Sequence, residues 1–232
     1  PYSEETPNLY IPENVSETQI NFIDLPSAVQ SEIQVTNLID LKMSHPDYFP
    51  LLVANSILGG DFGSYINMNL REEHGYTYGA FSTFKTDKWT KGNFSIKTKV
   101  GNAVTAPAIV EILKEVKRIQ TTIVSEEKLA QAKAQYLGQF VLATERPQTI
   151  ANYAINIKVR NLPEDFYKNY IAKINTVTKE DVQRVANSYF LLKNFRIIIV
   201  GKGSDIADEL KNINFDGKKI PMKEFDSYGN KK

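Results

Sequence analysis

Two residues suited to polarising a carbonyl group stand on either side of a glycine turn. Arg71 and Tyr78 lie within residues 58–79, whose sequence is LGGDFGSYINMNLREEHGYTYG. Arginine offers five hydrogen-bond donors and tyrosine offers one. If both faced one cavity, they could hold peptide carbonyls and stabilise a developing oxyanion. Spacing alone favours a structural alternative, in which Arg71 ends a helix and Tyr78 begins a strand and packs in the core.

Metal chemistry has few candidate ligands, because the chain has two histidines and no cysteine. A catalytic zinc usually needs three protein ligands. His45 and His74 are far apart, and neither lies in H-E-x-x-H or H-x-x-E-H. We expect His45 at a helix start near the surface. We expect His74 in the last turn of its helix, where a partly charged imidazole is favoured. The sequence therefore predicts no metal and no cofactor in this chain.

Two glycine groups superficially resemble nucleotide-binding loops. Gly59, Gly60 and Gly63 lack a following Lys-Ser or Lys-Thr, and no strand precedes them, so they indicate a tight turn. The Gly-Lys-Gly at residues 201–203 follows a strand, but Ile206 stands where a dinucleotide loop needs its third glycine. We interpret it as a turn as well.

Other catalytic groups are also missing. There is no G-x-S-x-G motif, and the two histidines offer no evident general base. The adjacent carboxylates at residues 72–73 and 126–127 diverge on helix surfaces and indicate solvated charge.

Composition excludes several classes of protein. The 232 residues carry 28 basic and 27 acidic side chains, a balance that argues against nucleic acid or an anionic membrane as partner. No apolar run approaches the length of a membrane span. No signal peptide is evident and the chain opens with Pro1, which indicates a processed product or an excised piece. We expect a soluble protein, with the cytoplasm and the periplasm both left open.

The first half of the chain must position the arginine and the tyrosine. Residues 18–24 and 31–41 alternate apolar and polar side chains, as strands do. A buried helix follows, with Ser44 as its expected N-cap and Gly59–Gly60 as its expected left-handed end. A short helix over residues 64–74 leads into a hairpin of strands at residues 76–86 and 92–100.

The second half is mostly helical. Helices are expected after Asn102, Ser125 and Pro147, over residues 163–174, and after a capping box at Thr178. Residues 195–200 form a continuous apolar strand, expected at the centre of a sheet. These elements predict an α+β fold, a mostly antiparallel sheet with helices on one side. We divide the chain into a lead-in (1–17), one domain (18–212) and a polar C-terminal tail (213–232).

Residues 58–82 resemble the signature of the non-zinc half of pitrilysin-type zinc metallopeptidases, the superfamily of insulinase and mitochondrial processing peptidase. The matching positions are Leu58, Gly59, Gly60, Ser64, Leu70, Arg71, Gly75 and Tyr78. The stretch at residues 28–33 and the strand at residues 195–201 are similar to the entering and closing strands of that domain. The resemblance covers roughly residues 18–212.

The resemblance implies a clamshell of two related α+β halves around a chamber. One half carries H-x-x-E-H and binds zinc. The other lacks zinc and contributes Arg71 and Tyr78, as auxiliary catalytic residues, to substrate binding and transition-state stabilisation. This chain matches the second half, so it would not hydrolyse peptides alone. Its expected partners are a peptide substrate and a zinc-bearing domain or subunit.

Two other functions remain open from the sequence. The first is a structural or assembly subunit on the same fold, like the core proteins of respiratory complexes. An intact Arg71 and Tyr78 count mildly against it. The second is a peptide-binding module that acts alone.

Overall fold

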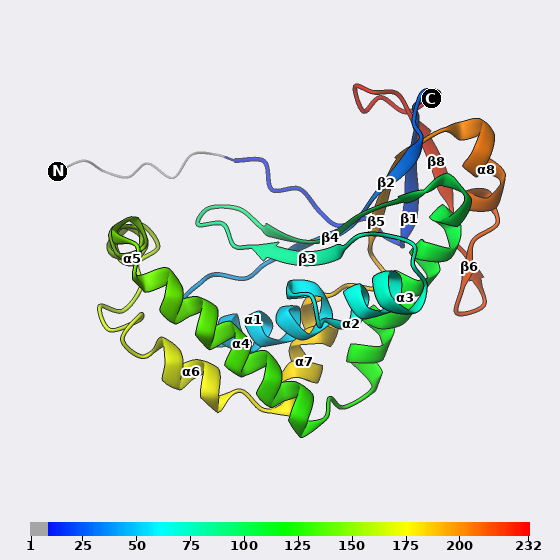
Figure 1. Ribbon diagram of the computed structural model, residues 1–232. Helices are drawn as coiled ribbons and strands as arrows, with labels where there is room; N and C mark the ends of the chain where they lie inside the picture. The colour runs from blue at the N-terminus through cyan, green and yellow to red at the C-terminus, as the bar shows by residue number, and fades with distance from the viewer. Residues whose placement is uncertain (1–8) are drawn as a thin grey trace.

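The computed structural model describes residues 9–232, so residues 1–8 of the expected lead-in lie outside the described residues. The main sheet has six strands in the order β3-β4-β2-β5-β1-β8 (Figure 1). Its strands are β1 Gln19–Asp24, β2 Gln30–Ile39, β3 Ala80–Lys85, β4 Gly92–Gly101, β5 Arg196–Gly201 and β8 Met222–Phe225. The strands from β3 to β5 are antiparallel, and β1 runs parallel to β5 and β8. The predicted α+β class and mostly antiparallel sheet are confirmed.

The sheet extends further along the chain than expected. β5 lies between β2 and β1, which confirms its predicted central place. Residues 213–232, expected as a polar tail, contribute β8, whose Met222 pairs with Ile20 of β1. They also contain the small hairpin of β6 (Asn214–Phe215) and β7 (Lys218–Lys219). Backbone hydrogen bonds to β1 explain why this polar segment forms a strand, because strand pairing at an edge does not require apolar side chains.

Most helices lie on one side of the sheet, beneath β3 and β4 in Figure 1, as predicted, and α8 (Gly203–Lys211) lies at the far end beside β8. The other helices are α1 Tyr48–Asn55, α2 Tyr65–Asn67, α3 Thr105–Thr121, α4 Glu126–Thr144, α5 Pro147–Val159, α6 Tyr170–Thr176 and α7 Lys179–Tyr189. In β2, Ile33 and Val35 are buried against these helices, whereas Glu32 is exposed on the open face. Within residues 9–232, no helix has both the length and the apolar character of a membrane span.

Local geometry differs from the expected elements around the motif. α1 starts at Tyr48 with Asp47, not Ser44, as its N-cap residue. The expected helix over residues 64–74 is α2 followed by the π-helical turn η2 (Met68–Glu73), and a second π-helical turn, η1 (Ser56–Gly60), follows α1. π-helical turns are rare and frequently occur at functional sites.

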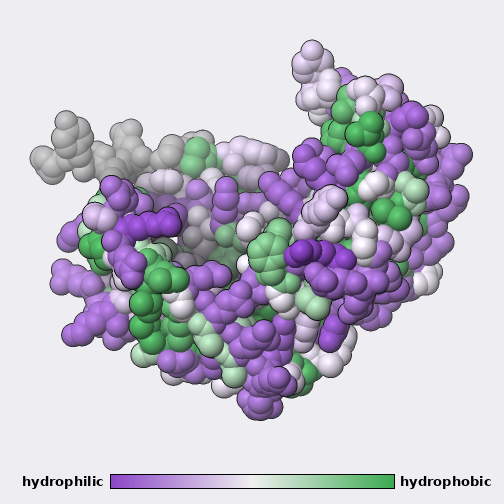
Figure 2. Space-filling model, in the orientation of Figure 1, coloured by the Kyte–Doolittle hydropathy of each residue, from purple (hydrophilic) through white to green (hydrophobic). Residues whose placement is uncertain are grey.

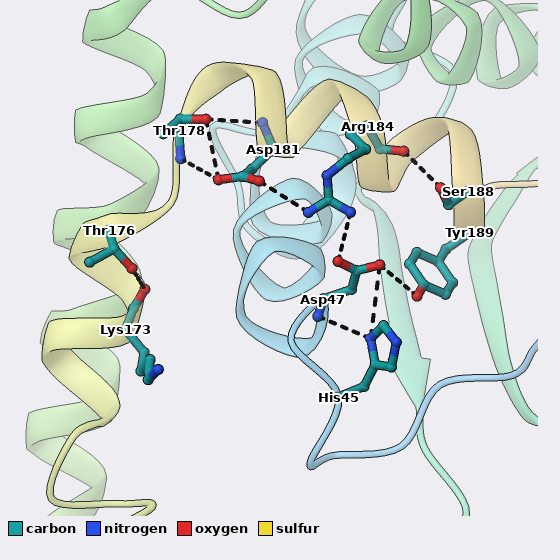
Figure 3. Close-up of polar contacts among 9 residues, drawn as sticks. All are labelled: His45, Asp47, Lys173, Thr176, Thr178, Asp181, Arg184, Ser188 and Tyr189. Carbon is teal, nitrogen blue, oxygen red and sulfur yellow. Dashed lines mark hydrogen bonds and ion pairs between the residues drawn. The ribbon is translucent and has the colours of Figure 1, made fainter.

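A polar network joins α7 to the start of α1 (Figure 3). The Asp47 carboxylate accepts hydrogen bonds from Arg184 at 2.6 Å and from the Tyr189 hydroxyl at 2.8 Å. Thr178 and Asp181 form the predicted capping box, and Asp181 also binds Arg184 at 3.0 Å. Burial raises the pKa of the Asp181 carboxyl, but the hydrogen bonds from Arg184 and Thr178 outweigh it and bring that pKa below its ordinary value.

Candidate functional site

The glycines at the start of the motif allow close packing of η1 on β3. Neither Gly59 nor Gly60 has a positive φ, so the expected left-handed helix end is wrong. A Cβ atom on Gly59 would lie 2.6 Å from the Ser82 Oγ and 2.8 Å from the Ser82 backbone nitrogen. Only a residue without a side chain fits between the turn and the strand.

Two asparagine side chains occupy the outer edge of β3. The buried Asn67 accepts a hydrogen bond from the Ala80 N–H at 3.1 Å and donates to the Phe62 carbonyl at 2.8 Å. Asn55 donates to the Ser82 carbonyl at 3.3 Å and accepts from the Ser82 hydroxyl at 2.9 Å. An edge strand would otherwise leave these backbone groups unpaired. The sequence analysis missed both residues, although an amide inside the apolar helical segment is a detectable signal for Asn55.

Arg71 lies in η2, along the same edge of β3. Its Nε is 3.4 Å from a carboxylate oxygen of Glu72, and its guanidinium lies 5.5 Å from the centre of the Phe62 ring. The Phe62 ring in turn meets the Phe81 ring of β3 edge to face, with centroids 5.4 Å apart. Both rings are exposed, and the sequence analysis missed them. A phenylalanine inside a glycine turn, as at position 62, is the signal that could have found the first.

The end of η2 turns the chain towards β3. Gly75 has φ +65°, and the Tyr76 N–H donates to the Leu70 carbonyl at 2.8 Å. This is the left-handed helix end for which glycine is preferred. The strand then begins at Ala80, later than the expected residue 76.

Tyr78 lies just before β3, between the hydrogen-bonded residues Thr77 and Gly79, with its side chain in solvent. The Thr98 hydroxyl of β4 lies within hydrogen-bond distance of both the Thr77 hydroxyl, at 3.0 Å, and the Gly79 carbonyl, at 3.1 Å. Tyr78 itself is 95% exposed and makes no side-chain hydrogen bond within residues 9–232. The structural alternative of a core tyrosine is therefore wrong, because this phenol is not buried.

A concavity with a volume of about 530 Å³ lies on the open face of the sheet beside Tyr78. Residues of β2, β4 and β5 line it, including Lys97 and the ion pair of Glu32 with Lys99 at 2.7 Å. Arg71 lies outside this lining, at the outer edge of β3. The structure thus places Tyr78 at the concavity and Arg71 outside it, without a direct contact between the two side chains.

The two histidines lie apart and each has a local partner. The His45 Nδ1 accepts a hydrogen bond from the Asp47 N–H at 3.1 Å, close to the helix start as expected. His74 stacks on Tyr76 and lies 3.7 Å from a carboxylate oxygen of Glu111. The described part of the chain gathers no cluster of three or more histidine, aspartate or glutamate side chains that could hold a metal ion.

The fold and this site define an α+β half-domain, with an open polar sheet face and an exposed arginine and tyrosine at its edge. The family model of the peptidase M16 inactive domain matches residues 3–136, so the chain belongs to this family. That membership confirms the resemblance to the non-zinc half of this class of zinc proteases. No curated protein sequence matches the chain.

Solved structures share the fold at low sequence identity. The peptidase M16 inactive domain from Pseudomonas fluorescens superposes with a TM-score of 0.76 at 22% identity, over 84% of this chain and 46% of that one. A protease from Helicobacter pylori superposes with a TM-score of 0.73 at 16% identity, over 82% of this chain and 45% of that one. A chain of complex III from Candida albicans superposes with a TM-score of 0.65 at 16% identity, over 82% of this chain and 47% of that one. This chain spans less than half the length of these structures.

Proposed function

We propose that this chain is the substrate-binding, zinc-lacking half of a zinc metalloendopeptidase. Its partner is a domain or subunit that carries H-x-x-E-H and the zinc, and the two halves enclose a peptide in a chamber. The observation that carries the proposal is Tyr78, which is 95% exposed between two anchored residues: the Thr77 side chain is hydrogen-bonded to Thr98, and the Gly79 backbone is hydrogen-bonded to Thr77 and Thr98.

The surroundings of Tyr78 support a functional role because they hold it in place without using it. A phenol in solvent buries no apolar area and contributes little to folding. Nevertheless, Gly75, Thr77 and Thr98 fix the path of the chain on either side of it. A site that holds reacting groups needs such a prepared position, because disorder at the reacting centre slows the reaction.

In this mechanism, the phenol of Tyr78 donates a hydrogen bond to the substrate carbonyl oxygen as negative charge develops on it. Arg71 binds a neighbouring carbonyl or carboxylate of the peptide with its fork of donors. Zinc bound by the partner would supply an activated water for the attack. The open sheet face beside Tyr78 provides the wall of the chamber on this side.

Replacing Tyr78 tests the proposal in the complete peptidase. Tyr78→Phe keeps the ring and removes the donor, so we expect kcat to fall by about 10²-fold or more. Tyr228→Phe is the matched control, because Tyr228 is 90% exposed and lies far along the chain, and it should leave kcat unchanged. Equal rates in wild type and Tyr78→Phe would exclude the proposed role.

A structural subunit is the second candidate, favoured by the similar fold of the chain in complex III. The two functions separate in one assay with the genuine partner. A zinc-bearing partner that cleaves peptides only when this chain is present supports the peptidase. Stable assembly without any cleavage supports the structural subunit. Peptide affinity of this chain alone would instead support an independent binding module.

A further inference from the structure

Five aromatic rings stand almost parallel within the helical layer. They come from α4, α5, α6 and the turn before α6, and they are Tyr136, Phe140, Tyr153, Tyr167 and Tyr170. Their stacked pairs have interplanar angles between 1° and 11°. The tightest pairs are Tyr153 with Tyr167 at 3.8 Å and Phe140 with Tyr170 at 4.3 Å between centroids. We call this set the ring stack.

The ring stack lines a cavity of about 500 Å³. That volume lies in the range of small-molecule sites. Among residues 9–232, twelve line the cavity, and Arg160 at the end of α5 is the only charged one of these. The site is separate from the concavity beside Tyr78, because the ring stack belongs to the helices and Tyr78 faces the open side of the sheet.

Arg160 is positioned but not neutralised. Its Nη1 donates to the carbonyl and the hydroxyl of Thr86 at 3.2 and 3.0 Å, and its Nε donates to Asn156 at 3.4 Å. These bonds use neutral acceptors and leave the Nη2 donors for a ligand. Within residues 9–232, no carboxylate forms an ion pair with Arg160.

Neutral hydroxyl groups complete the lining. The Tyr136 and Tyr170 hydroxyls lie 2.9 Å apart and share a hydrogen bond. Burial raises the pKa of both phenols, so they stay protonated and add no negative charge beside Arg160. The cavity therefore offers flat apolar faces, one cation and neutral polar groups.

The helices do not close this space by ordinary core packing. α5 has no buried residue, and Ile150, Ile155 and Val159 on it are each more than half exposed. Figure 2 shows hydrophobic residues gathered over this end of the helical layer. Within the ring stack, Tyr170 is buried, whereas the other four rings are partly exposed beside this loosely packed helix.

We propose that the ring stack and Arg160 form a binding site for a small planar aromatic carboxylate. The ring of the ligand lies against the parallel faces, where aromatic stacking is favourable. Its carboxylate accepts hydrogen bonds from the free donors of Arg160, an arrangement for which guanidinium is well suited. The cavity takes a free small molecule of this chemistry.

Calorimetric titration of the whole chain with naphthalene-2-carboxylate tests the site. Wild type should bind it at least tenfold more tightly than naphthalene-2-methanol, which lacks the charge, and than cyclohexanecarboxylate, which lacks the flat ring. Arg160→Gln should weaken binding of the carboxylate by about tenfold or more, because a hydrogen bond to a charged group is lost. Arg146→Gln, the same charge change at the opposite end of α5, should leave it unchanged.

Ala143→Trp is a second variant that keeps Arg160, since Ala143 lines the cavity and a large ring there fills it. It should abolish binding, and thermal unfolding would confirm that each variant folds. No binding by wild type at millimolar probe would overturn the proposal. Equal affinities of Arg160→Gln and Arg146→Gln, or undiminished binding by Ala143→Trp, would overturn it as well.

Discussion

The edge of β3 and the helical segment from α4 to α6 are ordered in different ways. At the β3 edge, Gly59 and Asn67 are fully enclosed, and polar side chains satisfy the backbone of the strand. From α4 to α6, few residues are buried, and stacked aromatic rings provide the contacts. Close backbone packing leaves no free space, whereas ring stacking leaves a cavity. The first arrangement suits groups that must be held still, and the second suits a ligand that must enter.

Two glycine substitutions, one in each region, should have opposite effects on stability and therefore give the strongest test of this difference. Gly59→Ala places a methyl group 2.6 Å from the Ser82 Oγ, so we expect a loss of about 3 kcal/mol in the free energy of unfolding. Gly138→Ala in α4 meets no atom within 4 Å and should stabilise the protein by about 0.5–1 kcal/mol, because alanine favours a helix.

Urea unfolding of both variants measures the difference. The m-value should stay at the wild-type value in each, since neither change alters the surface exposed on unfolding. If Gly59→Ala were neutral, η1 could not be packed tightly on β3, and the contrast between the two regions would disappear.

Replacing Asn67, whose side chain hydrogen-bonds the edge of β3, should have the next largest effect on the free energy of unfolding. Asn67→Ala leaves the Ala80 N–H and the Phe62 carbonyl without their partners in a buried place, which costs about 2 kcal/mol. Amide exchange at Ala80 should also become faster in the variant. Asn212→Ala is the control, because its exposed hydrogen bond to Asp208 should contribute little. Unchanged exchange at Ala80 would contradict the proposed role of Asn67.

Local signals predicted much of the fold, and tertiary contacts decided the rest. Alternating polarity and apolar runs were sufficient to predict strands β1 to β5 and the central place of β5 in the sheet. The capping box at Thr178 was also predictable, because its partners lie within one turn. The π-helical turn η1 and strand β8 were not, since η1 packs against Ser82 and β8 pairs with Ile20, and both partners come from distant segments.

The candidate site was predictable only as a pair of residues. Arg71 and Tyr78 were found from the motif, and their catalytic role stays a prediction. Phe62 has only its place inside a glycine turn as a sequence signal, and Asn67, at the same edge, has none. Their importance depends on which atoms of β3 come within hydrogen-bond or ring contact after folding.

A pH series on Asp181 tests the polar network that joins α7 to the start of α1. Asp181→Asn removes a charged acceptor for Arg184 and weakens the capping box, so we expect a loss of about 1 kcal/mol near neutral pH. The folded pKa of this carboxyl is lowered, so its contribution exists above its unfolded pKa and is lost as pH falls through the folded one. The difference between variant and wild type should therefore shrink towards acidic pH. Glu180→Gln, exposed in the same helical turn, is the control, and a pH-independent difference would contradict this origin.

The smallest effect on stability is expected at the proposed functional residue itself. Tyr78→Phe removes only an exposed hydroxyl that makes no hydrogen bond to any residue the structure describes, so the free energy of unfolding should change by less than about 0.5 kcal/mol. Chemical unfolding of this chain measures it, with Asn67→Ala as the comparison at the same strand edge. A loss approaching that of Asn67→Ala would mean that the phenol packs against the protein and is not free for a substrate. A neutral result means that any loss of turnover in the complete peptidase reflects the missing donor, because the scaffold that holds Tyr78 is unchanged.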